Sequence, residues 1–81
     1  MQKSPTLLRQ DGYRCFFFSG EEPRLQVHIS GAAGEAKYWL VPAVELAWHN
    51  GLRSDQLTAV EAVVTEHRDA FRTAWSRHFG S

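Results

Sequence analysis

The chain has 81 residues, of which 43% are hydrophobic, 12% aromatic and 22% charged, and its formal net charge at pH 7 is zero. This length suits a single domain over residues 1–81, and the neutral balance argues against binding nucleic acid through bulk positive charge. One cysteine, Cys15, excludes an internal disulfide, and no apolar run approaches the roughly 18 residues of a membrane span. We therefore expect a cytoplasmic protein without membrane contacts.

The first strands are predicted on either side of a tight turn. Residues 6–9 form a short apolar run, and residues 13–18 form an aromatic run of the kind that favours strands. Between them lies Asp11-Gly12, a dipeptide that favours the two-residue turns of β-hairpins. Residues 19–23 contain Gly and Pro and are typical of a loop.

Three further segments alternate between apolar and polar residues. In residues 24–30 the apolar side chains are Leu25, Val27 and Ile29, and a strand turns every second side chain to one face. Residues 35–40 and residues 44–49 repeat this alternation after a small-residue turn and after Pro42, respectively. In the last segment the apolar set is Val44, Leu46 and Trp48.

The C-terminal third predicts a helix. Ser54 is a good N-cap, and no Gly or Pro follows between Gly51 and Gly80. Apolar residues recur at intervals typical of one helix face, at Leu57, Val60, Val64, Phe71, Trp75 and Phe79. We expect one helix from about residue 54 to residue 78, roughly 37 Å long. A break near Glu66-His67-Arg68 is the alternative.

Together these elements predict an α+β fold, in which an antiparallel meander of four to five strands carries one long C-terminal helix packed on one face. A strand of six residues spans only about 20 Å. A helix of the expected length therefore overhangs the sheet or crosses it obliquely. If Phe71, Trp75 and Phe79 at its far end do not all reach the sheet, they form an exposed apolar patch, which usually indicates a partner.

The sheet face away from the helix is expected to gather the polar side chains. A histidine, a carboxylate and cations on neighbouring strands can perform acid–base chemistry on a phosphodiester, and Phe16 or Trp39 can stack a base. A solvated surface gives the same pattern, because the outer face of an antiparallel sheet is usually polar. The residues concerned are Arg14, Gln26, His28, Glu35, Lys37, Trp39, Glu45 and His49. Alternation places Phe16 and Phe18 on the same strand face as Arg14.

Neither a metal nor another cofactor is expected. The histidines stand at positions 28, 49, 67 and 78, whereas a metal site needs three or four ligands that cluster. Cys15 lies within the aromatic strand and is expected to be a small buried hydrophobic residue.

Several segments of the chain resemble a family of small bacterial proteins of unassigned function. They are Asp11-Gly12-Tyr13-Arg14 with Phe16-Phe17-Phe18-Ser19, and Glu35-Ala36-Lys37-Tyr38-Trp39-Leu40 with Pro42 and Val44-Glu45-Leu46-Ala47. Members of that family are often encoded beside a second small domain, in two-gene cassettes that resemble type II toxin–antitoxin modules. The family commonly has a His-Ile-His-Val strand, for which this chain has Gln26-Val27-His28-Ile29. Because glutamine cannot shuttle a proton at neutral pH, this difference weakens a two-histidine nuclease mechanism and leaves binding untouched.

The resemblance implies a toxin component that inhibits growth through an RNA or a translation-related target, with a small cognate antitoxin as partner. It leaves open whether the chain is a ribonuclease-type enzyme. On this hypothesis His28 transfers protons, Lys37 and Arg14 hold phosphate, and Glu35 orients the reaction or acts as base.

The remaining candidates concern binding. Gln26 and Trp39 would contact the ligand on the same sheet face as His28. The alternative to a toxin is a non-catalytic interaction module, which binds a partner protein or forms a homodimer. Its contact surface is either the outer sheet face or the helix end that carries Phe71, Trp75 and Phe79.

Overall fold

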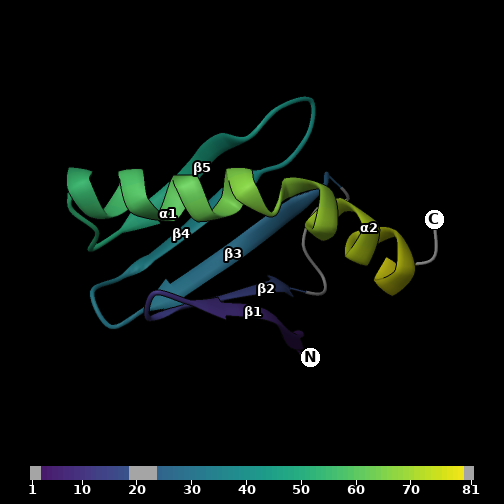
Figure 1. Cartoon of the computed structure of the whole chain (residues 1–81), viewed down its shortest axis with the longest axis horizontal. Coiled ribbons are helices and arrows are strands. Elements are labelled where there is room, and N and C mark those ends of the chain that lie inside the picture. Colours follow the sequence, from purple (N-terminus) through teal and green to yellow (C-terminus); the bar gives the residue numbers. More distant parts are fainter. Residues whose placement is uncertain (1–2, 19–23, 80–81) are drawn as a thin grey trace.

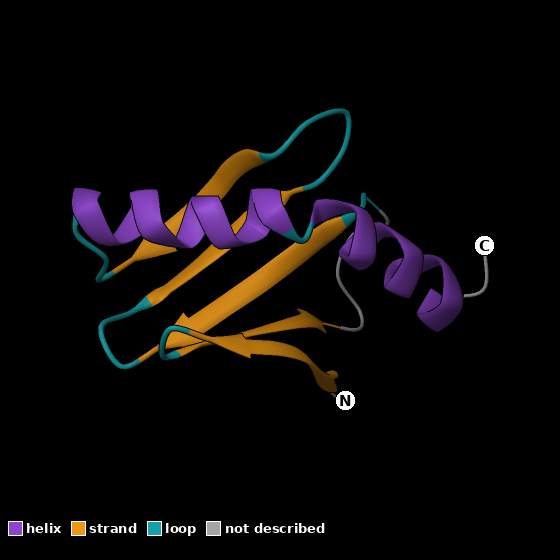
Figure 2. Ribbon diagram, in the orientation of Figure 1, coloured by secondary structure: helices purple, strands orange, loops and turns teal. Residues whose placement is uncertain are grey.

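The computed structural model describes residues 3–18 and 24–79, with side chains for residues 6–17 and 24–77. Over these residues it consists of an antiparallel sheet, with strand order β1-β2-β3-β4-β5, followed by two helices. Both helices lie on the same side of the sheet (Figures 1 and 2). The α+β class and the antiparallel meander are therefore confirmed. The elements are β1 (Lys3–Gln10), β2 (Tyr13–Phe18), β3 (Gln26–Gly31), β4 (Glu35–Trp39), β5 (Glu45–Asn50), α1 (Ser54–Glu66) and α2 (Arg68–Phe79).

The turn between β1 and β2 forms at the predicted dipeptide. Asp11 has a φ of 55° and Gly12 a φ of 82°. Positive φ values at both central residues are what the favoured hairpin turns require, and Asp-Gly adopts them readily. The turn brings Gln10 opposite Tyr13 and Arg9 opposite Arg14.

The core lies between the sheet and the helices. Val27 and Ile29 of β3 and Ala36 and Tyr38 of β4 face the helices, as the alternation predicted. The hydroxyl of Tyr38 donates to the carbonyl oxygen of Leu57 at 3.5 Å, which links β4 to α1. The buried cluster consists of Cys15, Phe17, Val27, Ile29, Ala36, Tyr38, Leu40, Leu52, Val60, Val63, Val64 and Phe71.

The single long helix predicted for the C-terminal third is wrong, and the alternative break is correct. His67 separates α1 from α2 with a φ of −105° and a ψ of 13°. Hydrogen bonds continue across it, because its N–H donates to the Val63 carbonyl at 3.1 Å and its carbonyl accepts from Phe71 at 2.9 Å. The helix therefore bends at His67 rather than stopping there.

Residues at the bend contact β1 and the connection between β4 and β5. His67 Nε2 lies 3.1 Å from the side-chain oxygen of Gln10. The guanidinium of Arg68 donates to the carbonyl oxygens of Leu40 at 3.4 Å and Pro42 at 3.2 Å. Beyond the bend, Trp75 of α2 meets Phe17 of β2 at 5.1 Å between ring centroids.

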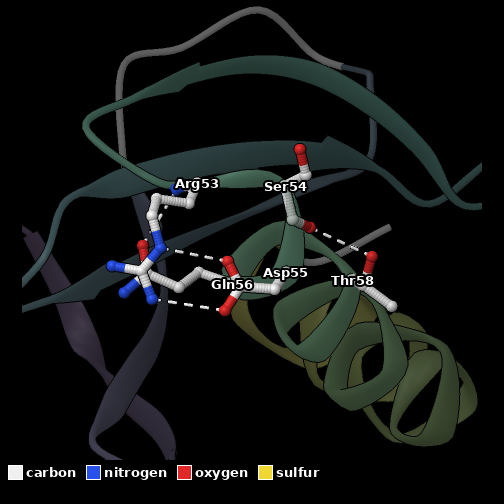
Figure 3. A network of polar contacts seen from close by, with 5 residues as sticks. All are labelled: Arg53, Ser54, Asp55, Gln56 and Thr58. Atoms are coloured by element: carbon white, nitrogen blue, oxygen red, sulfur yellow. Dashed lines mark hydrogen bonds and ion pairs between the residues drawn. The ribbon is translucent and has the colours of Figure 1, made fainter.

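At the start of α1 the N-cap is Arg53 and not Ser54, so that prediction is off by one residue. The Arg53 carbonyl accepts the first helical bond, from Leu57 at 2.8 Å, and the Arg53 N–H donates to the side chain of Gln56 at 2.9 Å. The Arg53 guanidinium donates to Asp55, and the hydroxyl of Thr58 donates to the Ser54 carbonyl (Figure 3). The hydrogen bond from Arg53 also holds the pKa of Asp55 below its usual value.

A bulge changes the facing of β5. Lys37 pairs with Trp48 and Tyr38 pairs with Leu46, which leaves Ala47 as an extra residue. Side chains after Ala47 therefore point to the opposite face from the one that strict alternation predicted. Trp48 leaves the helix side, and His49, which pairs with Ala36, moves to it.

Two glycines allow the β3–β4 turn to touch the end of β5. A Cβ built on Gly34 would overlap the carbonyl oxygen of Asn50. Gly51 has a φ of 87°, and a Cβ there would lie 2.7 Å from the Ala33 carbonyl oxygen. Side chains at these positions would separate the two segments.

None of the described helices combines the length and the apolar character needed to cross a membrane.

Candidate functional site on the open sheet face

The side of the sheet away from α1 and α2, here called the open face, carries a row of four side chains from four strands. Phe16 pairs with His28, His28 with Lys37, and Lys37 with Trp48. Directly opposed residues of antiparallel strands share a face, and their Cβ atoms lie about 5 Å apart. His28 and Lys37 are therefore neighbours on the open face. We call Phe16, His28, Lys37 and Trp48 the central row.

A second row runs beside the central row, nearer the β1–β2 turn. Arg9 pairs with Arg14, Arg14 with Ser30, and Ser30 with Glu35. Successive residues on one face of a strand are about 7 Å apart. Glu35 is therefore a diagonal neighbour of His28, at a separation that long side chains can bridge.

At its turn end the second row borders a hollow of about 440 Å³. Arg9, Arg14 and Ser30 contribute to its lining together with the Asp11-Gly12 turn. The two arginines are directly opposed across β1 and β2. Like charges in this position repel each other, and an anion between them would relieve that repulsion.

Phe16 is covered on the open face and does not offer a surface for a base. The guanidinium carbon of Arg14 lies 4.3 Å from the centroid of its ring, and Arg14 Nε donates to the hydroxyl of Thr6 at 2.8 Å. The imidazole of His28 stacks on Phe16 at 5.5 Å with an interplanar angle of 25°. Phe16 is consequently 9% exposed, and it positions Arg14 and His28.

Trp39 holds cations in the same manner. The guanidinium carbon of Arg24 lies 4.3 Å from the Trp39 ring centroid, and the ammonium of Lys37 lies 4.9 Å from it. Arg24 is fixed by two hydrogen bonds to the Val41 carbonyl, at 3.3 and 3.1 Å, and by a contact of 3.7 Å with Glu45. Trp39 thus belongs to the site as a support for Lys37, and the base-stacking role predicted for it does not fit this packing.

Gln26, which was predicted to contact a ligand, has its side chain buried below the open face. It is 1% exposed, although its pairing with Trp39 places it on the open face. Its amide nitrogen donates to the carbonyl oxygen of Arg24 at 3.2 Å. Gln26 therefore stabilises the backbone that carries Arg24.

Two side chains of the apolar patch expected for an overhanging helix, Phe71 and Trp75, pack on the core instead. Phe71 is 3% exposed and belongs to the core cluster. Trp75 packs edge-on against Phe17 and is partly buried against the same core. The bend at His67 brings both residues to the sheet. The side chain of Phe79 lies outside the described residues.

Sequence reasoning missed Trp48, which is 48% exposed and lies beside Lys37 in the central row. Strict alternation placed it in the core, because it did not include the bulge at Ala47. A bulge that contains no glycine leaves no fixed mark in the sequence. Trp48 is the aromatic side chain of the central row that a planar ligand can reach.

The geometry brings together Arg14, His28, Glu35 and Lys37, and it adds Arg9 and Trp48. Cations of this kind bind phosphate groups, an exposed indole stacks on bases, and imidazole transfers protons near neutral pH. In the part of the chain that the structure describes, no three His, Cys, Asp or Glu side chains gather in a way that would hold a metal ion.

These features define a small α+β domain with helices on one sheet face and cations packed on aromatic rings on the other. The chain belongs to a family described as a domain of unknown function, DUF4160, whose model matches residues 12–76. The match includes every residue of the central row. No curated protein and no solved structure matches the chain.

Proposed function

We propose that this protein is the toxin of a two-gene toxin–antitoxin pair and that it acts on RNA through the open face. The observation that carries the proposal is the central row, in which His28 lies directly opposite Lys37 and Lys37 directly opposite the exposed Trp48. A proton-transfer group, a phosphate-binding cation and a stacking surface thus occupy three adjacent strands.

The roles follow from chemistry. A base stacks on Trp48, and the phosphate next to it binds Lys37, while Arg14 and the hollow beside it bind a neighbouring phosphate. His28 takes the proton of a ribose 2′-hydroxyl, and the 2′ oxygen bonds to phosphorus as the bond from phosphorus to the 5′ oxygen breaks. The leaving 5′ oxygen takes a proton from water. Lys37 stabilises the charge that develops on phosphorus-bound oxygens, and Glu35 orients His28.

The first test is induced expression in a bacterial host. We expect the wild-type protein to arrest growth, and we expect His28→Ala and Lys37→Ala to restore it, because each removes one part of the central row. Arg72→Ala is the matched control, since it removes a positive charge from an exposed position on α2. Thermal unfolding of each purified variant establishes that it is folded.

The results of the expression test and of an RNA degradation assay separate the possible functions. Arrest by both variants as strong as arrest by the wild type would contradict a site on the open face. Absence of arrest by the wild type would contradict the toxin assignment itself. Degradation of labelled RNA by the wild type and not by His28→Ala would support cleavage, whereas RNA binding without degradation would limit the function to binding.

A non-catalytic interaction module is the second candidate function. It is favoured by the exposed apolar side chains of Leu46 and Trp48 on β5. Under this function the wild type does not arrest growth, and Trp48→Ala weakens association with the partner while His28→Ala does not. Co-purification with the product of the adjacent gene measures that difference.

A further inference from the structure

β5 forms one edge of the sheet, and within the described chain it pairs with β4 alone. The opposite edge, β1, carries Lys3, Pro5 and two register irregularities, and all of these features discourage edge-to-edge pairing. β5 has one irregularity, the bulge at Ala47. The sequence of β5 is Glu-Leu-Ala-Trp-His-Asn, without Lys or Pro. Of the two edges, β5 is therefore the better template for another strand.

The exposed apolar side chains concentrate on this same strand. Among the described residues, the large hydrophobic side chains that are exposed are Leu46, at 37%, and Trp48, at 48%. Leu46 points to the helix side and Trp48 to the open face. A strand laid along the outer edge of β5 would cover part of both.

We propose that β5 pairs antiparallel with β5 of a second copy of this chain, so that the two sheets join into one continuous sheet. A twofold axis at the bulge sets Trp48 opposite Trp48 of the second copy. Leu46 then lies opposite His49 of the second copy, and Glu45 lies opposite Asn50 of the second copy.

The bulge is what makes this pairing consistent. Glu45 pairs with Trp39, Trp48 with Lys37 and Asn50 with Glu35, which places all three β5 side chains on the open face. Leu46 pairs with Tyr38 and His49 with Ala36, which places both on the helix side. In the proposed register every pair therefore has both members on the same face. A regular strand of six residues paired with itself over its full length would oppose side chains from different faces.

The side chains suit these pairings. Cross-strand aromatic pairs are among the more stabilising contacts in sheets, and the two indoles would bury surface that one copy leaves in water. The Glu45 carboxylate can accept a hydrogen bond from the Asn50 amide of the second copy, and no like charges are opposed. A second copy of this chain therefore fits the edge both in backbone register and in side-chain chemistry.

Disulfide trapping tests the register directly. Cys15, which is the only native cysteine, is fully buried, so engineered thiols report alone. In Glu45→Cys/Asn50→Cys the two thiols of one chain lie four ladder steps apart, roughly 13 Å along β5, which is beyond the reach of a disulfide. Mild oxidation should therefore join two copies, and non-reducing electrophoresis should show a closed covalent dimer.

Two controls make the trapping specific. Neither Glu45→Cys nor Asn50→Cys alone should form a comparable dimer, because each faces a different residue in the second copy. Glu45→Cys/His49→Cys places the second thiol on the wrong face and should not cross-link. No dimer from Glu45→Cys/Asn50→Cys, a ladder of higher oligomers, or equal yields from the control variants would overturn the proposal.

A separate measurement uses no cysteines. Sedimentation equilibrium of the wild-type protein should give the mass of a dimer, and Trp48→Glu should give a monomer, since it opposes two carboxylates at the axis. Trp48→Phe should remain dimeric, and the thermal unfolding of both variants reports their folding. A monomeric wild type would overturn the proposal. These readouts involve neither growth nor RNA, so failure of the dimer and failure of the proposed function are distinguishable.

Discussion

Cys15 shows how the position of a single residue sets its chemistry. It lies on β2 facing the helices and is fully buried. Because burial disfavours the charged thiolate, the pKa of the Cys15 thiol rises from 9.0 to about 11. The thiolate is the reactive form of cysteine, so Cys15 is a packing residue and not a nucleophile at neutral pH.

A pH dependence of stability follows from this pKa. The unfolded chain loses the thiol proton near pH 9.0, whereas the folded chain keeps it until about pH 11. The stabilisation is therefore fully present below pH 9.0 and is lost as the pH rises to about 11. At about 1.4 kcal/mol per pKa unit, the loss is on the order of 2–3 kcal/mol.

Urea unfolding of wild type and Cys15→Ala, across this pH range, measures the contribution. The free energy of unfolding of the wild type should fall more than that of Cys15→Ala. The variant is needed as control because burial also raises the pKa of Tyr38, to about 12, with Glu61 adding to the shift. Parallel curves for the two proteins would show that the thiol contributes nothing.

At the scale of elements, the bend between α1 and α2 decides what α2 does. The sequence from Glu66 to Arg68 has neither Gly nor Pro, so local propensity does not mark a break. At the bend, His67 and Arg68 contact residues far away in the chain. Contacts between residues distant in sequence cannot be inferred from a helical repeat. The repeat alone therefore predicts one continuous helix.

Trp75→Ala tests whether α2 is a structural element. Loss of the contact with Phe17 and of a half-buried side chain should lower the free energy of unfolding by about 2 kcal/mol. Association of the protein should not change, because Trp75 packs against Phe17 of β2, away from the β5 edge that we propose as the interface. Ser76→Ala, an exposed neighbour, is the matched control. Unchanged stability together with lost association would instead place Trp75 in an interface.

The sequence predicted the strands more reliably than the details that depend on neighbours. The alternation in β3 and β4 correctly separated Val27 and Tyr38 from His28 and Lys37, because those strands pair without irregularity. The bulge in β5 reversed the prediction for Trp48. The sequence does not specify packing within a face, so it could not show that cations cover Trp39.

Across the whole molecule, the formal net charge at pH 7 is zero. Close to the central row, Arg14, Arg24 and Lys37 are held on aromatic rings. Any RNA affinity must therefore come from a few local cations and not from the overall field. This distinguishes the protein from basic nucleic-acid binders, in which many phosphates are neutralised together.

The salt dependence of RNA binding should reflect the small number of cations near the central row. If three cations contact phosphates of a single strand, the logarithm of the affinity should fall with the logarithm of salt concentration with a slope of about −2. Lys37→Ala should make the slope shallower by about 0.7. Fluorescence anisotropy of a labelled single-stranded RNA measures both values. A slope near zero would contradict phosphate binding by these side chains.

The contact between Gly34 and the Asn50 carbonyl oxygen bears on how this chain tolerates sequence change. Surface loops usually accept substitution freely, yet here a single methyl group would force the β3–β4 turn away from the segment that leads into α1. In a saturation mutagenesis library selected for folding, position 34 should be as intolerant as the core. Accessibility alone would therefore misjudge which positions of this chain tolerate substitution.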